Sequence, residues 1–174
     1  MRVTPETVAV EHEWVHDRVD VVVPLINVVR NRLGPKFGTT VDGVTTAAYH
    51  EAVDAVFADG DRAVNATALI RILRDLDVED DYPGFVVDEL LGRELAALIA
   101  GDQPLRLLAE STFHYADVLL SEHATRPGPD AHAGPEGPDD VAGADDLDAA
   151  LAAGFQTRLP GWEWTEQPSP FRVE

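Results

Sequence analysis

The spacing of apolar residues between positions 65 and 121 predicts three consecutive helices. Two stripes recur at intervals of three and four residues, the repeat of one helical face. These stripes are Ala66–Leu69–Ile70–Leu73–Leu76 and Leu105–Leu108–Thr112–Ala116–Leu119. The segment between them is apolar along two rows, Val87–Leu91–Leu95–Leu98 and Val86–Leu90–Ala97. A helix with two apolar rows usually has neighbours on both sides, so we expect residues 85–99 at the centre of the domain.

Two further helical patterns precede this region. The first begins near the amino terminus and is interrupted at Pro24, which lacks the N–H needed for a helical hydrogen bond, so we expect a kink or a restart there. The β-branched run at 19–23 leaves a short strand as the alternative. The second pattern occupies residues 44–58 and ends in a turn at 59–61. Four or five helices joined by short loops predict an all-α, bundle-like domain over residues 1–124.

The composition changes after this domain. Residues 125–146 are rich in proline, glycine and acidic residues and cannot bury enough apolar surface to offset their ordering entropy, so they predict a flexible acidic linker. Residues 147–174 form an extended, largely irregular aromatic arm, with two helical turns expected at 147–153. Aromatic residues of this kind typically anchor interfaces, so we expect the arm to dock on another chain; the alternative is that it completes its own core. The expected contact residues are Phe155, Leu159, Trp162, Trp164 and Phe171.

The charge of the chain points to a saline environment. The 174 residues include 32 acidic and 13 basic residues, giving a net charge of −19, and Lys36 is the only lysine. Self-repulsion of this size opposes folding in dilute buffer and is tolerated in concentrated salt. The composition is therefore typical of a halophilic microbe or one of its viruses, with an ordinary acidic cytosolic protein as the alternative. The Debye length in molar salt is only about 3 Å, so the net charge says little about partners.

Other compositional features exclude several classes of site. The chain has no cysteine, which rules out disulfides, thiolate catalysis and cysteine-based metal sites. We find no apolar run of signal-peptide form and none long enough to span a membrane, so we expect a location in the cytoplasm, or in a virion if the protein is viral.

Residues 12–16 match the H-E-x-x-H pattern of zinc hydrolases, in which two histidines one turn apart bind zinc and the glutamate acts on the metal-bound water. The candidate ligands are His12 and His16, with Glu13 as the base. Two observations favour a structural role instead. Too few residues precede His12 to form the sheet that holds the substrate in such enzymes, and His12 falls on an apolar stripe. We therefore expect no metal and no cofactor. Three other histidines match no ligand spacing: His50, His114 and His123.

Residues 65–98 also fit a helix-turn-helix, with Asn65 as the cap of the first helix. A DNA-binding version needs base-reading side chains at the start of its second helix. That start, residues 84–89, is apolar and acidic, and Val87 suits a core better than a DNA groove. The only compensating basic cluster is Arg62, Arg71 and Arg74. Two packed core helices are therefore the favoured interpretation.

These patterns favour a non-enzymatic assembly subunit. A small helical domain with an extended carboxyl-terminal arm resembles the head–tail adaptor proteins of tailed viruses, which ring the portal and reach along their neighbours. The resemblance concerns architecture only, and a virus of a halophilic host would fit the composition. It implies a homo-oligomer that contacts other protein subunits and neither membrane nor nucleic acid. The alternatives are a helix-turn-helix regulator and a zinc-dependent hydrolase using residues 12–16.

Overall fold

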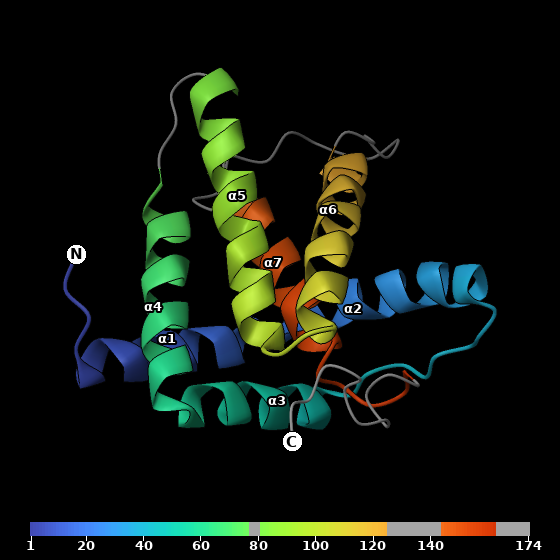
Figure 1. Ribbon diagram of the computed structural model, residues 1–174, viewed down its shortest axis with the longest axis horizontal. Helices are drawn as coiled ribbons and strands as arrows, with labels where there is room; N and C mark the ends of the chain where they lie inside the picture. Colours follow the sequence, from blue (N-terminus) through green and yellow to red (C-terminus); the bar gives the residue numbers. More distant parts are fainter. Residues whose placement is uncertain (77–80, 125–143, 163–174) are drawn as a thin grey trace.

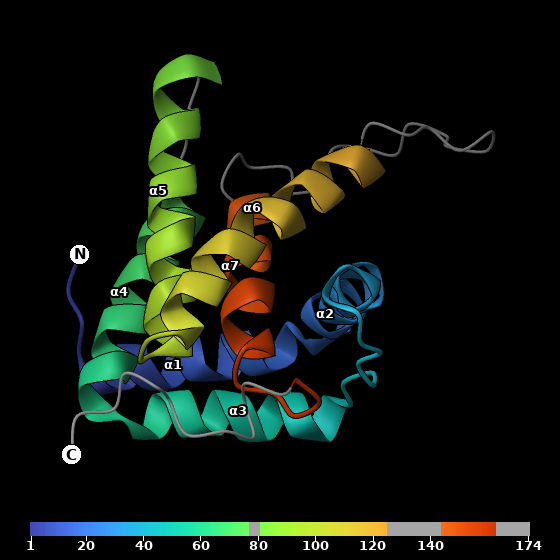
Figure 2. The same cartoon turned by 45° about the vertical axis from the view of Figure 1, so that its right-hand side comes forward.

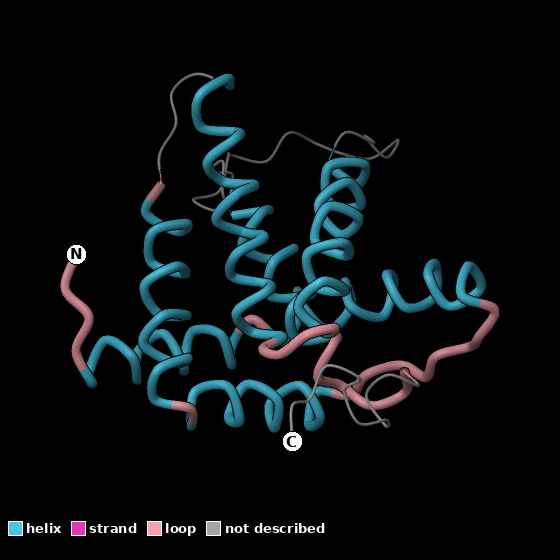
Figure 3. Tube along the Cα trace, viewed as in Figure 1, coloured by secondary structure: helices cyan, strands magenta, loops and turns pink. Residues whose placement is uncertain are grey.

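The computed structural model describes residues 1–76, 81–124 and 144–162. These stretches form seven α-helices and one short 3-10 helix and contain no strand, so the protein is all-α, as the sequence predicts (Figure 1 and Figure 3). No helix within them is long and apolar enough to cross a membrane. The elements are α1 (Pro5–Asp17), α2 (Val19–Leu33), η1 (Gly34–Phe37), α3 (Thr46–Ala58), α4 (Gly60–Asp75), α5 (Asp81–Ala100), α6 (Leu105–Ala124) and α7 (Ala144–Gln156).

Three helices form a base and three others stand on it. α1, α2 and α3 lie across the bottom of Figure 1, and α4, α5 and α6 rise from them in alternating directions. Figure 2 shows the same arrangement from another side. α7 runs through the middle and packs against α2, α3, α4, α5 and α6. The last described helix is therefore the centre of the molecule.

Small residues allow α7 to occupy this position. The helix contains a run of alanines and Gly154, and its residues from Leu147 onward are buried. A Cβ atom added to Gly154 would lie 2.7 Å from the Cβ of Ile99 on α5. One added to Gly92 of α5 would lie 2.6 Å from the ring of Phe113 on α6. The backbones in this part of the core therefore approach one another at places where only glycine fits.

This arrangement corrects two expectations. Residues 85–99 lie beside the centre rather than at it, because α7 takes that place. The structural domain does not end at residue 124, because α7 and the turn that follows it, as far as Trp162, belong to the core. The physical reason is that an alanine- and glycine-rich helix buries its backbone and Cβ atoms closely, without the long apolar side chains that mark a core helix in a sequence.

Tertiary contacts also move two helix boundaries. The first break falls at Arg18 rather than at Pro24, which lies inside α2, and the strand considered for residues 19–23 is not formed. Arg18 pairs with Asp148 of α7 at 2.5 Å, a contact that the local pattern does not reveal. α4 begins at Gly60 instead of after Asn65. Asp59 ends α3 and also caps α4, since its carboxylate accepts a hydrogen bond from the Arg62 N–H at 3.2 Å.

Candidate functional site

The aromatic residues expected to meet a partner are, where the structure describes them, part of the core. Phe155, Leu159 and Trp162 are each 1% exposed or less. The Phe155 ring lies edge-on to Tyr49, with 5.3 Å between the ring centroids. This corrects the expectation that these three side chains dock on another chain, because the domain buries them itself. Two other expected contact residues lie outside the described stretches: Trp164 and Phe171.

The two histidines of the H-E-x-x-H pattern do come together, where α1 faces α3. His12 Nε2 lies 2.8 Å from Asp54 Oδ1, and His16 Nε2 lies 3.9 Å from the same oxygen. The His16 ring stacks on His50 with 3.6 Å between centroids, and His50 Nε2 lies 3.3 Å from the carbonyl oxygen of His16. The cluster therefore joins one helix to another through partly buried histidines and the exposed carboxylate of Asp54.

The arrangement of this cluster differs from that of a hydrolase zinc site. In the described stretches, no group of three or more His, Cys, Asp or Glu residues is placed to hold a metal ion. His12 already contacts a carboxylate, and Glu13, the candidate base, is exposed. What the geometry provides is a polar contact between helices. Of the other two histidines considered as ligands, His114 is exposed on α6, and the side chain of His123 is outside the described part.

The pair formed by α4 and α5 lacks the arrangement of a DNA-binding helix-turn-helix. In such a motif the second helix crosses the first at a steep angle, which frees its amino-terminal end to enter a groove. α4 and α5 instead run antiparallel, side by side, in both Figure 1 and Figure 2. The pair is a helical hairpin in which α4 packs against part of the length of α5, which fits the interpretation of two packed core helices.

The arginines that could compensate for the acidic start of α5 are engaged inside the molecule. Glu11 of α1 is completely buried, and its carboxylate accepts hydrogen bonds from Arg74 at 2.7 and 2.8 Å and from Arg71 at 3.4 Å. Arg62 pairs with Asp59 at 3.6 Å. Because burying a carboxylate without partners costs much free energy, Arg71 and Arg74 are needed as partners of Glu11. They are poorly placed to neutralise phosphates.

The outward face of α5 is one of the places where large apolar side chains are exposed. Val87 is 42% exposed and Leu90 is 47% exposed, and Glu94 continues the same face one turn further on. This corrects the expectation that Val87 is a core residue. The two apolar rows of α5 are covered by α4, α6 and α7 only in their carboxyl-terminal halves, where Leu95 and Ala97 are fully buried. The amino-terminal half extends beyond α4 and α6 in both views (Figure 1 and Figure 2).

The same helix turns a carboxylate inward. Asp88 is 2% exposed, and its Oδ1 atom has no hydrogen-bond partner. Burial raises the pKa of the Asp88 carboxyl above its ordinary value. Asp88 is therefore a buried carboxylate that lies in the sequence between the exposed Val87 and Leu90. The sequence gives one indication of this surface, because the two apolar rows of α5 are longer than the part of the helix that its neighbours cover.

Comparison with known proteins identifies the family. One family model, described as "Domain of unknown function (DUF7984)", matches residues 1–174. The chain therefore belongs to that family. No curated protein matches the chain. No solved structure matches it either.

Proposed function

We propose that this member of the DUF7984 family is a non-enzymatic assembly subunit whose copies associate through the outward face of α5. The observation that supports the proposal is the exposure of Val87 and Leu90 on a helix whose apolar rows continue into the core. Exposed apolar residues that continue a buried row mark a surface that gains from being covered. The partner we assign to that surface is a second copy of the chain.

The charge of the chain favours self-association in concentrated salt. Two copies with a net charge of −19 repel one another in dilute buffer. In molar salt the Debye length falls to about 3 Å, and the repulsion between the copies is screened. The apolar contact then remains as the attractive term, because salt does not weaken apolar burial and strongly hydrated salts strengthen it. Association should therefore increase with ionic strength, opposite to an interface held by ion pairs.

The finer form of the proposal is a head–tail adaptor of a tailed virus with a halophilic host. A compact helical domain with an acidic surface supports it by analogy of architecture. In that form the outward face of α5 in one copy would contact a different surface of the next copy, so that the copies close into a ring. The alternatives receive less support. The histidine cluster joins α1 to α3, and Arg74 of α4 is bound to Glu11 of α1.

Mass measurement by light scattering in about 2 M salt tests the proposal. The wild-type chain, 18.9 kDa as a monomer, should form an oligomer of defined size. Val87→Glu should shift it to monomer, because a charge would be placed in the contact. The matched control is Val21→Glu, on α2, where the valine is 39% exposed and also helical. Both variants should keep the helical circular dichroism of the wild type.

The measured mass distinguishes simple self-association from a ring adaptor. A discrete oligomer larger than a dimer supports the ring, whereas a dimer supports self-association but excludes the ring adaptor. A wild-type chain that stays monomeric at high concentration in 2 M salt would contradict both. If Val21→Glu disrupts the oligomer and Val87→Glu does not, the interface lies on the base of the molecule instead of α5.

A further inference from the structure

A cavity of about 150 Å³ lies between the end of α2, α6 and the turn that follows α7. Apolar and aromatic side chains form most of its wall: Leu33, Phe37, Leu108, Tyr115 and Trp162. Apolar cavities of about this volume accommodate a molecule of the size of benzene. The cavity draws on three regions of the chain that are far apart in sequence, and no sequence pattern singled it out.

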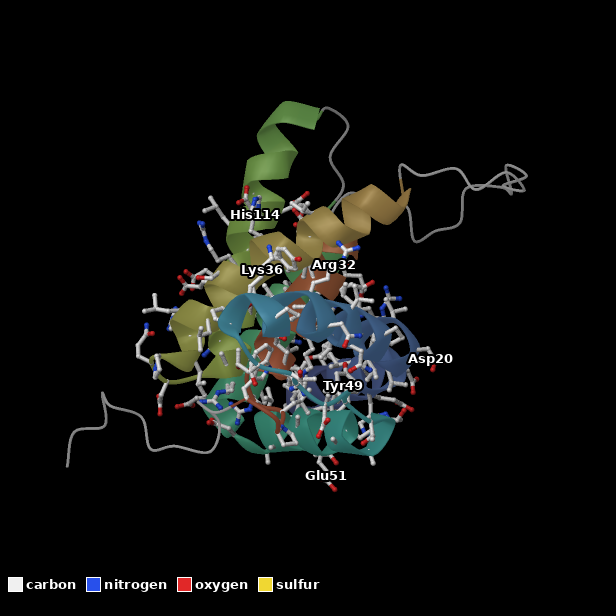
Figure 4. All side chains as sticks on the ribbon, turned by 90° about the vertical axis from the view of Figure 1, so that its right-hand side faces the viewer. Asp20, Arg32, Lys36, Tyr49, Glu51 and His114 are labelled. Carbon is white, nitrogen blue, oxygen red and sulfur yellow. The ribbon has the colours of Figure 1, made fainter. Side chains whose placement is uncertain are left out.

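Aromatic rings form part of the wall of the cavity. The rings of Phe37 and Trp162 stand edge to face, with 6.2 Å between centroids and 90° between planes. Phe37 is 59% exposed at the mouth, whereas Trp162 is 1% exposed at the back. Lys36, the only lysine of the chain, holds its Nζ atom 5.4 Å from the centroid of the Tyr115 ring. Figure 4 shows Lys36 on this face of the molecule, near Arg32 and below His114.

The lining includes a buried side-chain oxygen that can accept a hydrogen bond. Gln156 is 2% exposed, lines the cavity, and its Oε1 atom has no hydrogen-bond partner. The hydroxyls of Thr112 and Thr157 donate to the carbonyl oxygens of Leu108 and Gly154, at 2.6 and 2.7 Å. Each hydroxyl proton is thereby used, and the hydroxyl oxygens remain as acceptors. A guest that donates a hydrogen bond would satisfy the Oε1 atom of Gln156.

The floor of the cavity is fixed in place by a buried arginine. Arg30 of α2 is 2% exposed and donates to the carbonyl oxygens of Pro160 at 2.8 Å, Leu159 at 3.3 Å and Gln156 at 3.4 Å. Its guanidinium carbon lies 5.9 Å from the centroid of the Trp162 ring. Burial lowers the pKa of Arg30 to about 10, partly offset by Asp42, so the group stays charged at neutral pH. A site held in this way loses little entropy on binding.

We propose that this cavity binds a small, flat, mostly apolar molecule of about one ring that donates a hydrogen bond to Gln156. Phenols and small nitrogen heterocycles with an N–H group belong to this chemical class. Burial of the guest between Leu33, Tyr115 and Trp162 supplies the affinity, and the hydrogen bond supplies the selectivity. The inference does not depend on self-association, since none of these residues belongs to the outward face of α5.

The test uses the full chain in about 2 M salt, with phenol and toluene as probes of nearly equal size. Amide chemical shifts in a titration followed by nuclear magnetic resonance give the dissociation constants. Wild type should bind phenol more tightly than toluene. Gln156→Leu should weaken phenol binding about tenfold, the equivalent of one hydrogen bond, and leave toluene binding equal or tighter.

A second variant blocks the mouth in case Gln156→Leu alters the core. Ser111 is exposed and lines the cavity, so Ser111→Trp should abolish the binding of both probes without disturbing the fold. Val118→Trp is the control, on the exposed side of the same helix and outside the lining. The proposal is overturned if the wild type binds neither probe at millimolar concentrations. It is equally overturned if Ser111→Trp leaves phenol binding intact, because the probe then binds elsewhere. If Gln156→Leu weakens the binding of both probes alike, the hydrogen bond to Gln156 supplies no selectivity and the proposal also fails.

Discussion

At the scale of single residues, the scarce basic side chains are placed where the fold needs them most. Arg74 neutralises the buried Glu11, Arg18 pairs with Asp148 of the central helix, and Arg30 holds the turn after that helix. Arg158 donates to the carbonyl oxygens of Ile99 and Ala100 at the end of α5, at 2.9 and 3.4 Å. These carbonyls have no partner within the helix, so the arginine supplies one. The result is a charged interior framework beneath an acidic surface.

Tyr49 gives a prediction for alkaline pH. Its ring is completely buried and its hydroxyl donates to the carbonyl oxygen of Val15 at 2.8 Å. Burial raises the pKa of the Tyr49 hydroxyl strongly; the nearby Asp148 adds to the increase and Arg18 partly opposes it. The unfolded chain releases this proton near pH 10, whereas the folded chain keeps it. The stability that Tyr49 contributes is therefore complete below about pH 10 and is lost as the pH rises above it, by up to about 1.4 kcal/mol per pH unit.

Comparison with Tyr49→Phe isolates this contribution, because other groups titrate in both proteins. Arg30 is one of them. Its folded pKa is about 10, below the ordinary value of 12.5, so its effect on stability rises over the same pH interval and partly masks that of Tyr49 in the wild type. Urea unfolding at pH 8, 9.5 and 11 gives the difference in unfolding free energy between the two proteins. We expect the unfolding free energy of the wild type to exceed that of Tyr49→Phe at pH 8 and no longer to exceed it at pH 11. A difference in unfolding free energy that stays constant across this pH range would contradict the raised pKa of Tyr49 in the folded protein.

At the scale of helices, the sequence predicts the elements better than their contacts. The long apolar stripes identify α4, α5 and α6, because side chains on one face of a helix meet the core at a regular period. The importance of α7 could not be read in this way. Ala149, Ala150 and Ala153 contribute little apolar surface individually, and their value depends on how closely α5 and α6 approach, which is a property of the assembled fold.

The two candidate sites differ in what the sequence could reveal. The outward face of α5 had a signal, since Val87 and Leu90 extend rows that the domain covers only in part. The cavity had none. Phe37, Tyr115 and Gln156 come from separate elements, and each has an ordinary structural explanation when read in its own segment. Only the folding of the turn after α7 onto α2 brings them together.

Close packing of α7 against α5 predicts an asymmetry between two glycines. Gly154→Ala would place a Cβ atom 2.7 Å from Ile99 Cβ and 3.0 Å from the carbonyl oxygen of Ala96, neither of which can move without shifting the helix. We expect it to lower the unfolding free energy by about 1–3 kcal/mol, as overpacked cores do. Gly60→Ala, at the start of α4, meets nothing within 4 Å and should be neutral or slightly stabilising. Thermal melts of the three proteins measure this, and equal melting temperatures for the two variants would contradict the close approach of α7 to α5.

At the scale of the whole molecule, interior pairing leaves a large excess of negative charge outside. The chain has 32 acidic residues against 13 basic ones, and several of the arginines contact carbonyl oxygens or buried carboxylates. Most acidic side chains therefore have no cation to neutralise them. Their mutual repulsion acts on the compact state more than on the expanded chain, because folding brings them closer together.

The folding of this molecule should consequently depend on ionic strength. The Debye length grows from about 3 Å in 1 M salt to more than about 10 Å below 0.1 M, so repulsion between neighbouring surface carboxylates reappears on dilution. We expect helical circular dichroism to weaken and the melting temperature to fall, by about 10 °C, between 2 M and 0.05 M sodium chloride. Sodium sulfate at matched ionic strength separates two causes: screening saturates in the same way in both salts, whereas stronger apolar burial continues to rise in sulfate. A melting temperature that does not change across this range would show that the surface charge is balanced within the fold, and the halophilic interpretation would fail with it.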